Sequence, residues 1–106
     1  LGENIADNGG IRLAYKAYQK WKKENGNEEK LPGLPFTHEQ LFFLKGAQLW
    51  CANIRRKVAL NMIDTDPHTL KMFRTIGPFS NSVAFSKAFK CPSGSRMNPV
   101  KKCRVW

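Results

Sequence analysis

Two carboxylates stand four residues apart near the beginning of the sequence. Glu3 and Asp7 lie within residues 2–10, GENIADNGG. Side chains at this spacing lie one turn apart on the same face of a helix, so one carboxylate can bind a metal ion while its neighbour orients another ligand. The chain has only two histidines, His38 and His68, and no H-E-x-x-H motif. We therefore expect any metal bound by Glu3 to need ligands from outside this sequence, as in a piece of a larger protein.

The composition is that of an ordinary folded domain with a basic surface. The 106 residues are 42% hydrophobic and 25% charged, with a net charge of +10. This length allows one domain with a modest core, and no apolar run approaches the ~18 residues of a membrane span. The basic residues form small groups spread along the chain, with no zinc finger, RNA-recognition signature or long basic arm. The charge is therefore interpreted as a solvated surface, and nucleic acid is not an expected partner.

The sequence predicts that the elements which position these carboxylates are helices. Apolar residues recur at helical spacing over 11–21, and a first helix is predicted to begin near Asp7 or Asn8, both good N-caps, and to stop at Asn25-Gly26. Thr37 begins a capping box that opens a second helix. Its apolar residues, found nearly all round, predict a central, buried helix; they are Leu41, Phe42, Phe43, Leu44, Ala47, Leu49, Trp50, Cys51 and Ile54.

The second half of the chain is predicted to hold shorter helices. A short helix is predicted over 56–63. Asp66 and Pro67 resemble an N-cap and a first helical residue, and Gly77-Pro78 a helix stop. A last helix is expected over 81–90, followed by an irregular tail over 91–106. The predicted class is all-α, with four to five helices and part of the core supplied by chain that is not present here.

The three cysteines allow two interpretations. Cys51, Cys91 and Cys103 are odd in number and match no C-x-x-C motif. As free thiols they would be ordinary buried residues. As disulfides, at least one of them would need a partner elsewhere.

Taken in order, these residues resemble the neprilysin-like zinc metalloendopeptidases, which include the endothelin-converting enzymes. The similarity covers essentially the whole chain and implies the C-terminal part of that family's mainly helical catalytic domain. The fragments that carry it are ENIADNGG (3–10), QLFF (40–43), AQLWC (47–51), DPH (66–68), FR (73–74), Gly77, 85–91, MNP (97–99) and the terminal CRVW (103–106).

The resemblance gives the two carboxylates separate roles. Glu3 matches the family's glutamate zinc ligand, and Asp7 matches the aspartate that holds a zinc-bound histidine by its other N–H. The single zinc ion would take its two histidines from an upstream H-E-x-x-H helix, whose glutamate is the general base. From the residues alone, a glutamate near a helix start often only favours the helix dipole, and Asp7 often only caps.

Three further residues acquire implied roles. His68 matches the histidine that stabilises the oxyanion of the tetrahedral intermediate, and Arg74 the arginine that anchors the substrate. Trp50 matches a tryptophan at the hydrophobic pocket for the residue after the scissile bond, although core packing explains it equally well. Because His68 and Arg74 are six residues apart, they can share a cleft only if the helix starts after His68 or bends between them.

The resemblance also implies a compartment and an activity. In the family, the residues matching Cys51, Cys91 and Cys103 form disulfides with cysteines that precede this segment, which indicates an extracellular protein. Such proteins are type II membrane proteins, anchored by an N-terminal segment not seen here, or are secreted. The predicted function is the C-terminal part of a zinc metalloendopeptidase that cleaves peptides before hydrophobic residues and is inactive without the rest of its polypeptide.

A different class of function remains open. A basic, disulfide-linked segment could be a non-catalytic binding module derived from such a peptidase, attracted to anionic surfaces or to a partner chain. The presence of Glu3, Asp7, His68 and Arg74 together favours the enzyme, because a pure binding module needs none of them. An intact upstream H-E-x-x-H would decide for the enzyme.

Overall fold

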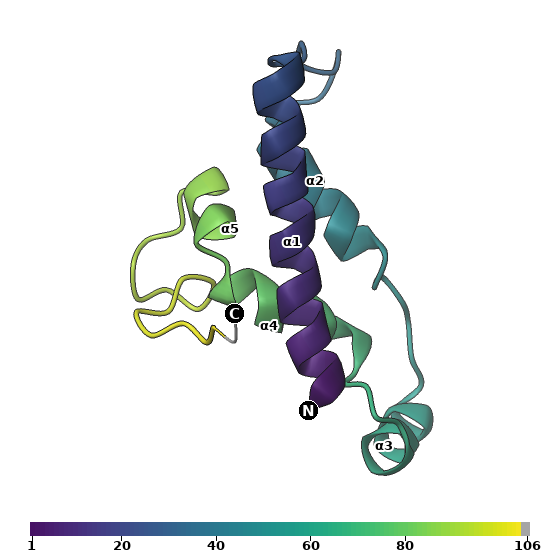
Figure 1. Ribbon diagram of the computed structural model, residues 1–106. Coiled ribbons are helices and arrows are strands. Elements are labelled where there is room, and N and C mark those ends of the chain that lie inside the picture. Colours follow the sequence, from purple (N-terminus) through teal and green to yellow (C-terminus); the bar gives the residue numbers. More distant parts are fainter. Residues whose placement is uncertain (105–106) are drawn as a thin grey trace.

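The computed structural model describes residues 1–104, and within them the regular secondary structure is helical (Figure 1). An isolated bridge between Ser95 and Asn98 is the one extended pairing in these residues. The predicted all-α class is confirmed. Five helices follow in order: α1 (Gly2–Asn25), α2 (His38–Gln48), α3 (Arg56–Thr65), α4 (Lys71–Asn81) and α5 (Val83–Ala88).

Helix α1 begins earlier than the sequence predicted. It starts at Gly2, with Leu1 as N-cap and the Leu1 carbonyl accepting the Ile5 N–H at 3.1 Å. The expected start near Asp7 or Asn8 is wrong, because both side chains bond to other groups instead of capping. Glu3 and Asp7 therefore lie in one continuous helix, a turn apart. Its end is as predicted, at Asn25 before Gly26, whose φ of 85° favours glycine.

Helix α2 has the predicted start but not the predicted length or burial. Thr37 and Gln40 form both bonds of the capping box. The helix ends at Gln48, and Trp50 and Cys51 follow in a turn of i to i−3 bonds. Phe43 is its one buried residue, whereas Leu49 is 71% exposed. The prediction of a buried helix reaching Ile54 is therefore wrong for this chain, in which little covers the outer apolar face.

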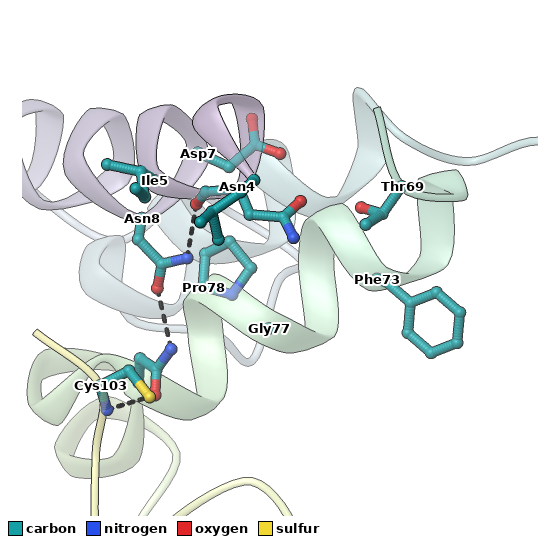
Figure 2. Close-up of a pocket in the computed structure, with 11 residues that line it drawn as sticks. Asn4, Ile5, Asp7, Asn8, Thr69, Phe73, Gly77, Pro78 and Cys103 are labelled. Carbon is teal, nitrogen blue, oxygen red and sulfur yellow. Dashed lines mark hydrogen bonds between the residues drawn. The ribbon is translucent and has the colours of Figure 1, made fainter. Parts of the chain in front are cut away.

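Helix α3 is present, but the predicted limits of the next helix are wrong. Asp66 follows the C-terminus of α3 rather than capping a new helix, and α4 begins only at Lys71. The Asp66 carboxylate instead accepts the His68 backbone N–H at 2.8 Å, which stabilises a bend there. Gly77 and Pro78 lie inside α4, where Pro78 is buried and lies beside α1 in Figure 2.

An aromatic cluster joins four helices into the core. Phe43 of α2 is 0% exposed and Phe79 of α4 is 5% exposed. The Phe43 ring centroid lies 5.3 Å from that of Tyr15 on α1 and 5.4 Å from those of Phe79 and Phe85. Gly46 of α2 packs against this cluster, since a Cβ there would stand 3.4 Å from the Phe79 ring and 3.6 Å from Ile11. The Tyr15 pair is stacked and the other two are edge-to-face, and aromatic pairs in these two arrangements each contribute about 0.5–1.5 kcal/mol beyond area burial.

The remaining segments lie around this core. The last helix, α5, is shorter than the predicted 81–90 and is capped by the Ser82 side chain. The tail packs near the end of α4, and α3 stands apart from the other helices (Figure 1). Within residues 1–104, no helix combines the length and the apolar composition needed to cross a bilayer.

Candidate functional site

Four residues singled out by the sequence meet beside the first two turns of α1. Glu3 and Asp7 come from α1, Arg74 comes from α4, and His68 comes from the bend between α3 and α4. The Glu3 Oε2 atom lies 3.1 Å from His68 Nε2, and both carboxylate oxygens of Asp7 contact Arg74. Helix α4 starts after His68, which is one of the two arrangements that allow His68 and Arg74 to face the same side.

Asp7 and Arg74 form a two-point ion pair. Arg74 donates from Nε to Asp7 Oδ2 at 2.7 Å and from Nη2 to Asp7 Oδ1 at 2.8 Å, and each side chain is 15% exposed. These hydrogen bonds raise the pKa of the Arg74 guanidinium above its usual value, against the opposing effect of burial. The sequence did not predict this pair. The two residues are 67 positions apart, and no local sequence motif links them.

The Trp50 ring covers one face of the same guanidinium. The Arg74 Cζ atom lies 3.8 Å from the centroid of the indole, a distance at which a cation is attracted to the ring face. Trp50 also borders an open hollow of about 640 Å³ with Ala47, Met72 and Ile76. It therefore belongs to this surface rather than to the aromatic core.

Asp66 is a site residue that sequence reasoning assigned to a cap instead. Its Oδ1 accepts from the His68 backbone N–H and from ring Nδ1, both at 2.8 Å. These bonds lower the pKa of Asp66, the backbone bond contributing most. Since an ionised carboxylate only accepts, Nδ1 carries a hydrogen. An Asp two residues before a His, next to Pro, is a signal that could have predicted this turn.

The residues present fit one part of a zinc site. Glu3 offers a carboxylate oxygen and its side chain is 45% exposed, so a metal and further donors can reach it. A catalytic zinc commonly takes three protein ligands. Residues 1–104 gather no group of three His, Cys, Asp or Glu side chains that could hold a metal ion. Glu3 is thus suited to be one ligand, with the remaining donors supplied from outside the described residues.

The cysteines do not pair with one another in the part of the chain that is described. Cys51 and Cys103 are exposed and Cys91 is partly buried, and all three are free thiols. Their disulfides with cysteines outside this segment stay a prediction.

Comparison with known proteins places this arrangement in a family. The sequence profile of Peptidase family M13 matches residues 1–105. Rabbit (Oryctolagus cuniculus) neprilysin is 59% identical over all 106 residues, and human membrane metallo-endopeptidase-like 1 is 52% identical over the same length. The chain spans 14% of the length of each of these relatives.

A solved structure gives the same result for the fold. The chain superimposes on part of the Haemonchus galactose containing glycoprotein complex with a TM-score of 0.92 and 37% sequence identity. The match covers 99% of this chain and 18% of that one. Together with the profile, these similarities show that the chain belongs to peptidase family M13, a family of zinc metallopeptidases.

Proposed function

We propose that this chain forms one side of the active site of an extracellular zinc metalloendopeptidase. The observation that supports the proposal is the convergence of Glu3, Asp7, His68 and Arg74 from three separate segments, with Glu3 3.1 Å from His68 and Asp7 2.7 Å from Arg74. A structural role alone does not require a partly exposed Glu–His pair beside a sheltered Asp–Arg pair. Both pairs lie beside the N-terminal end of α1.

Glu3 is the proposed zinc ligand of this chain. Two histidines of an H-E-x-x-H helix, from another part of the polypeptide, would complete the set. Zinc bound there supplies the Lewis acidity needed for peptide hydrolysis. Each Asp7 oxygen can accept more than the one bond it takes from Arg74, so Asp7 can also accept the N–H of a ligating histidine and fix its orientation.

His68 and Arg74 act on the substrate in this proposal. Asp66 accepts from the Nδ1–H of the imidazole, so a doubly protonated His68 can donate its Nε2–H to the oxyanion that develops on the scissile carbonyl. Arg74 uses Nε and Nη2 for Asp7, which leaves Nη1 to donate to a substrate carbonyl or carboxylate.

The proposed substrates are peptides with a large apolar residue after the scissile bond. The hollow bordered by Trp50, Met72 and Ile76 is mainly apolar and lies next to Arg74, which suits such a side chain. An extracellular location, as the ectodomain of a type II membrane protein or a secreted form, accords with the exposed Cys51 and Cys103, which can reach partners in other segments.

The test is Glu3→Val in the full-length protein. We expect bound zinc and chelator-sensitive peptidase activity to be lost together. The unfolding temperature, compared between the two metal-free proteins so that zinc itself adds nothing, should stay close to that of the unchanged protein, because Glu3 is partly exposed. Glu28→Val, at another exposed glutamate, is the matched control and should retain both. Retention of zinc and activity by Glu3→Val would refute the assignment.

A non-catalytic binding module is the competing function, favoured by the net charge of +10. It predicts a full-length protein without peptidase activity that binds anionic surfaces in a salt-dependent way. Activity lost on chelation and restored by zinc would exclude it.

A further inference from the structure

A chain of hydrogen bonds runs from the C-terminal tail to the first turns of α1. The Cys103 backbone N–H donates to Asn81 Oδ1 at 2.9 Å. Asn81 Nδ2 then donates to Asn8 Oδ1 at 2.9 Å, and Asn8 Nδ2 donates to the Asn4 carbonyl at 2.8 Å. Figure 2 shows this series along one edge of a pocket of about 360 Å³ between α1 and α4.

The direction of every bond in this series is fixed by its ends. A backbone N–H can only donate and a backbone carbonyl can only accept. The Asn81 oxygen must therefore face Cys103, its amino group must face Asn8, and the Asn8 amino group must face Asn4. Turning either amide would place like groups against each other, so the two asparagines are held in one orientation.

The series lies next to the proposed zinc ligand on the helix surface. Asn4 follows Glu3 and Asn8 follows Asp7 in the sequence. Asn4 and Asn8 therefore occupy the line of side chains on α1 next to the line of Glu3 and Asp7. On α4, Arg74 and Asn81 are seven residues apart and share one face. Helix α1 is thus joined to α4 at two neighbouring positions, by Asp7–Arg74 and by Asn8–Asn81.

Two such connections restrain a motion that one would permit. Farther along, α1 is held by the packing of Tyr15 on Phe43 and by the Lys22–Glu39 pair. Among the described residues of its first turns, Asp7–Arg74 would be the remaining polar link to α4 without Asn8–Asn81, and a small rotation of these turns could carry the Glu3 carboxylate away from His68. A second connection on the adjacent line of side chains opposes this rotation. The tail takes part through the Cys103 N–H, which fixes the orientation of Asn81.

We infer that Asn8 and Asn81 are positioning residues, which hold α1 at the rotation that directs Glu3 toward the zinc site. The inference rests on the proposed function for its metal and on the hydrogen-bond series for its geometry. The side-chain amides of Asn8 and Asn81 would thus affect zinc affinity without binding the metal or the substrate themselves.

The experiment compares Asn8→Ala, Asn81→Ala and the double variant in the full-length zinc-loaded protein. Zinc dissociation is measured by competition with a chelator, and hydrogen exchange is measured for the amides of residues 5–9. We expect each single change to raise the zinc dissociation constant about tenfold or more. The double change should add little, because either single change already breaks the series. Exchange in the first turns of α1 should become faster in the same variants.

Asn25→Ala is the matched control. Asn25 makes the same amide-to-carbonyl bond, to Trp21 at 2.8 Å, at the other end of α1. It should leave zinc affinity and exchange near Glu3 unchanged. An equal loss in Asn25→Ala would mean that general helix stability, not the series, carries the effect, and would overturn the inference.

Asn8→Asp keeps the shape of the side chain, so it tests the inference even if an alanine variant fails to fold. Aspartate can accept from Asn81 but cannot donate to the Asn4 carbonyl. Its added negative charge near the proposed zinc site should by itself strengthen zinc binding, whereas loss of the series should weaken it. Hydrogen exchange at residues 5–9 separates the two effects: faster exchange in Asn8→Asp supports the inference, and unchanged exchange overturns it.

The inference and the proposed function can fail separately. Retention of zinc by Glu3→Val would refute the zinc ligand, yet faster exchange at residues 5–9 in Asn81→Ala would still support the series as a positioning device. Unchanged exchange in that variant would overturn the inference even if Glu3 binds zinc.

Discussion

Arg74 is the residue whose surroundings say most about the site. It is held on one edge by both oxygens of Asp7 and on one face by the Trp50 ring. The sequence identified all three as residues of interest, through the family resemblance. It could not predict that they contact one another, because such contacts depend on how α1, α4 and the turn after α2 pack together.

Arg74→Lys tests this arrangement at the residue scale. Lysine keeps the positive charge but cannot make the two-point pair with Asp7 or stack its head group flat on Trp50. We expect kcat/KM for peptide hydrolysis by the full-length protein to fall tenfold or more. Arg96→Lys, at an exposed position in the tail, serves as the control. Equal activity of Arg74→Lys and the unchanged protein would show that the paired geometry is unimportant.

At the scale of elements, the sequence predicted the presence of the helices better than their limits. The capping box at Thr37 and the stop at Gly26 are local signals that the structure confirms. Asp66-Pro67 and Gly77-Pro78 are equally strong local signals, but neither acts as predicted: a competing local turn replaces the first, and the second lies within a continuing helix. Asp66 bonds His68 instead of capping, and α4 continues through a buried Pro78.

The start of α1 has a weak local signal, the acidic Glu3 in its first turn. Leu1 makes no side-chain capping bond, and the better capping residues, Asp7 and Asn8, bond to α4 and to the helix itself. Packing against α4 therefore places Asp7 and Asn8 inside α1 rather than at its N-cap. The same packing brings Glu3 and Asp7 to the candidate site.

An ion pair between α1 and α2 gives a pH-dependent prediction at this scale. Lys22 donates to Glu39, and their side chains are 28% and 26% exposed. The bond from Lys22 lowers the pKa of Glu39 below its usual 4.5. A carboxyl group with a lowered folded-state pKa stabilises the fold above its unfolded pKa, and the stabilisation is lost as the pH falls through the folded value.

Glu39→Gln should therefore reduce stability in a pH-dependent way. We expect a loss of about 1 kcal/mol at pH 7, which shrinks toward zero once the pH falls below the lowered pKa of Glu39. Thermal unfolding of the full-length protein and its Glu39→Gln variant across this range measures the difference. Glu24→Gln, in a pair with Lys20 that is well exposed, should have a smaller effect. A difference that stays constant with pH would contradict the ion-pair explanation.

At the scale of the whole molecule, the accessible surface area is larger than that of a compact monomer of the same mass. The accessible area is 8026 Å², against about 6,000 Å² expected for a compact monomer of 12.1 kDa. The radius of gyration is 15.4 Å, against about 13 Å for a compact domain of this length. Large apolar side chains are exposed on several helices, among them Leu49, Leu60 and Ile63. We expect the rest of the polypeptide to cover them.

The 106-residue chain on its own should consequently be inactive and weakly folded. Its buried core of large side chains is little more than Phe43 and Phe79 within the described residues, and those residues bring no three zinc donors together. Circular dichroism of the isolated chain should show no cooperative unfolding transition. A peptidase assay with and without chelator should show no zinc-dependent cleavage. Chelator-sensitive hydrolysis by the purified chain would refute this expectation.

The central claim is that Glu3 binds the catalytic zinc. A crystal structure of the zinc-loaded full-length protein, with anomalous data collected at the zinc edge, tests it most directly. We expect an anomalous peak about 2.0–2.2 Å from a Glu3 carboxylate oxygen, with two histidine nitrogens completing the protein ligands. A zinc peak that does not contact Glu3 would contradict the claim.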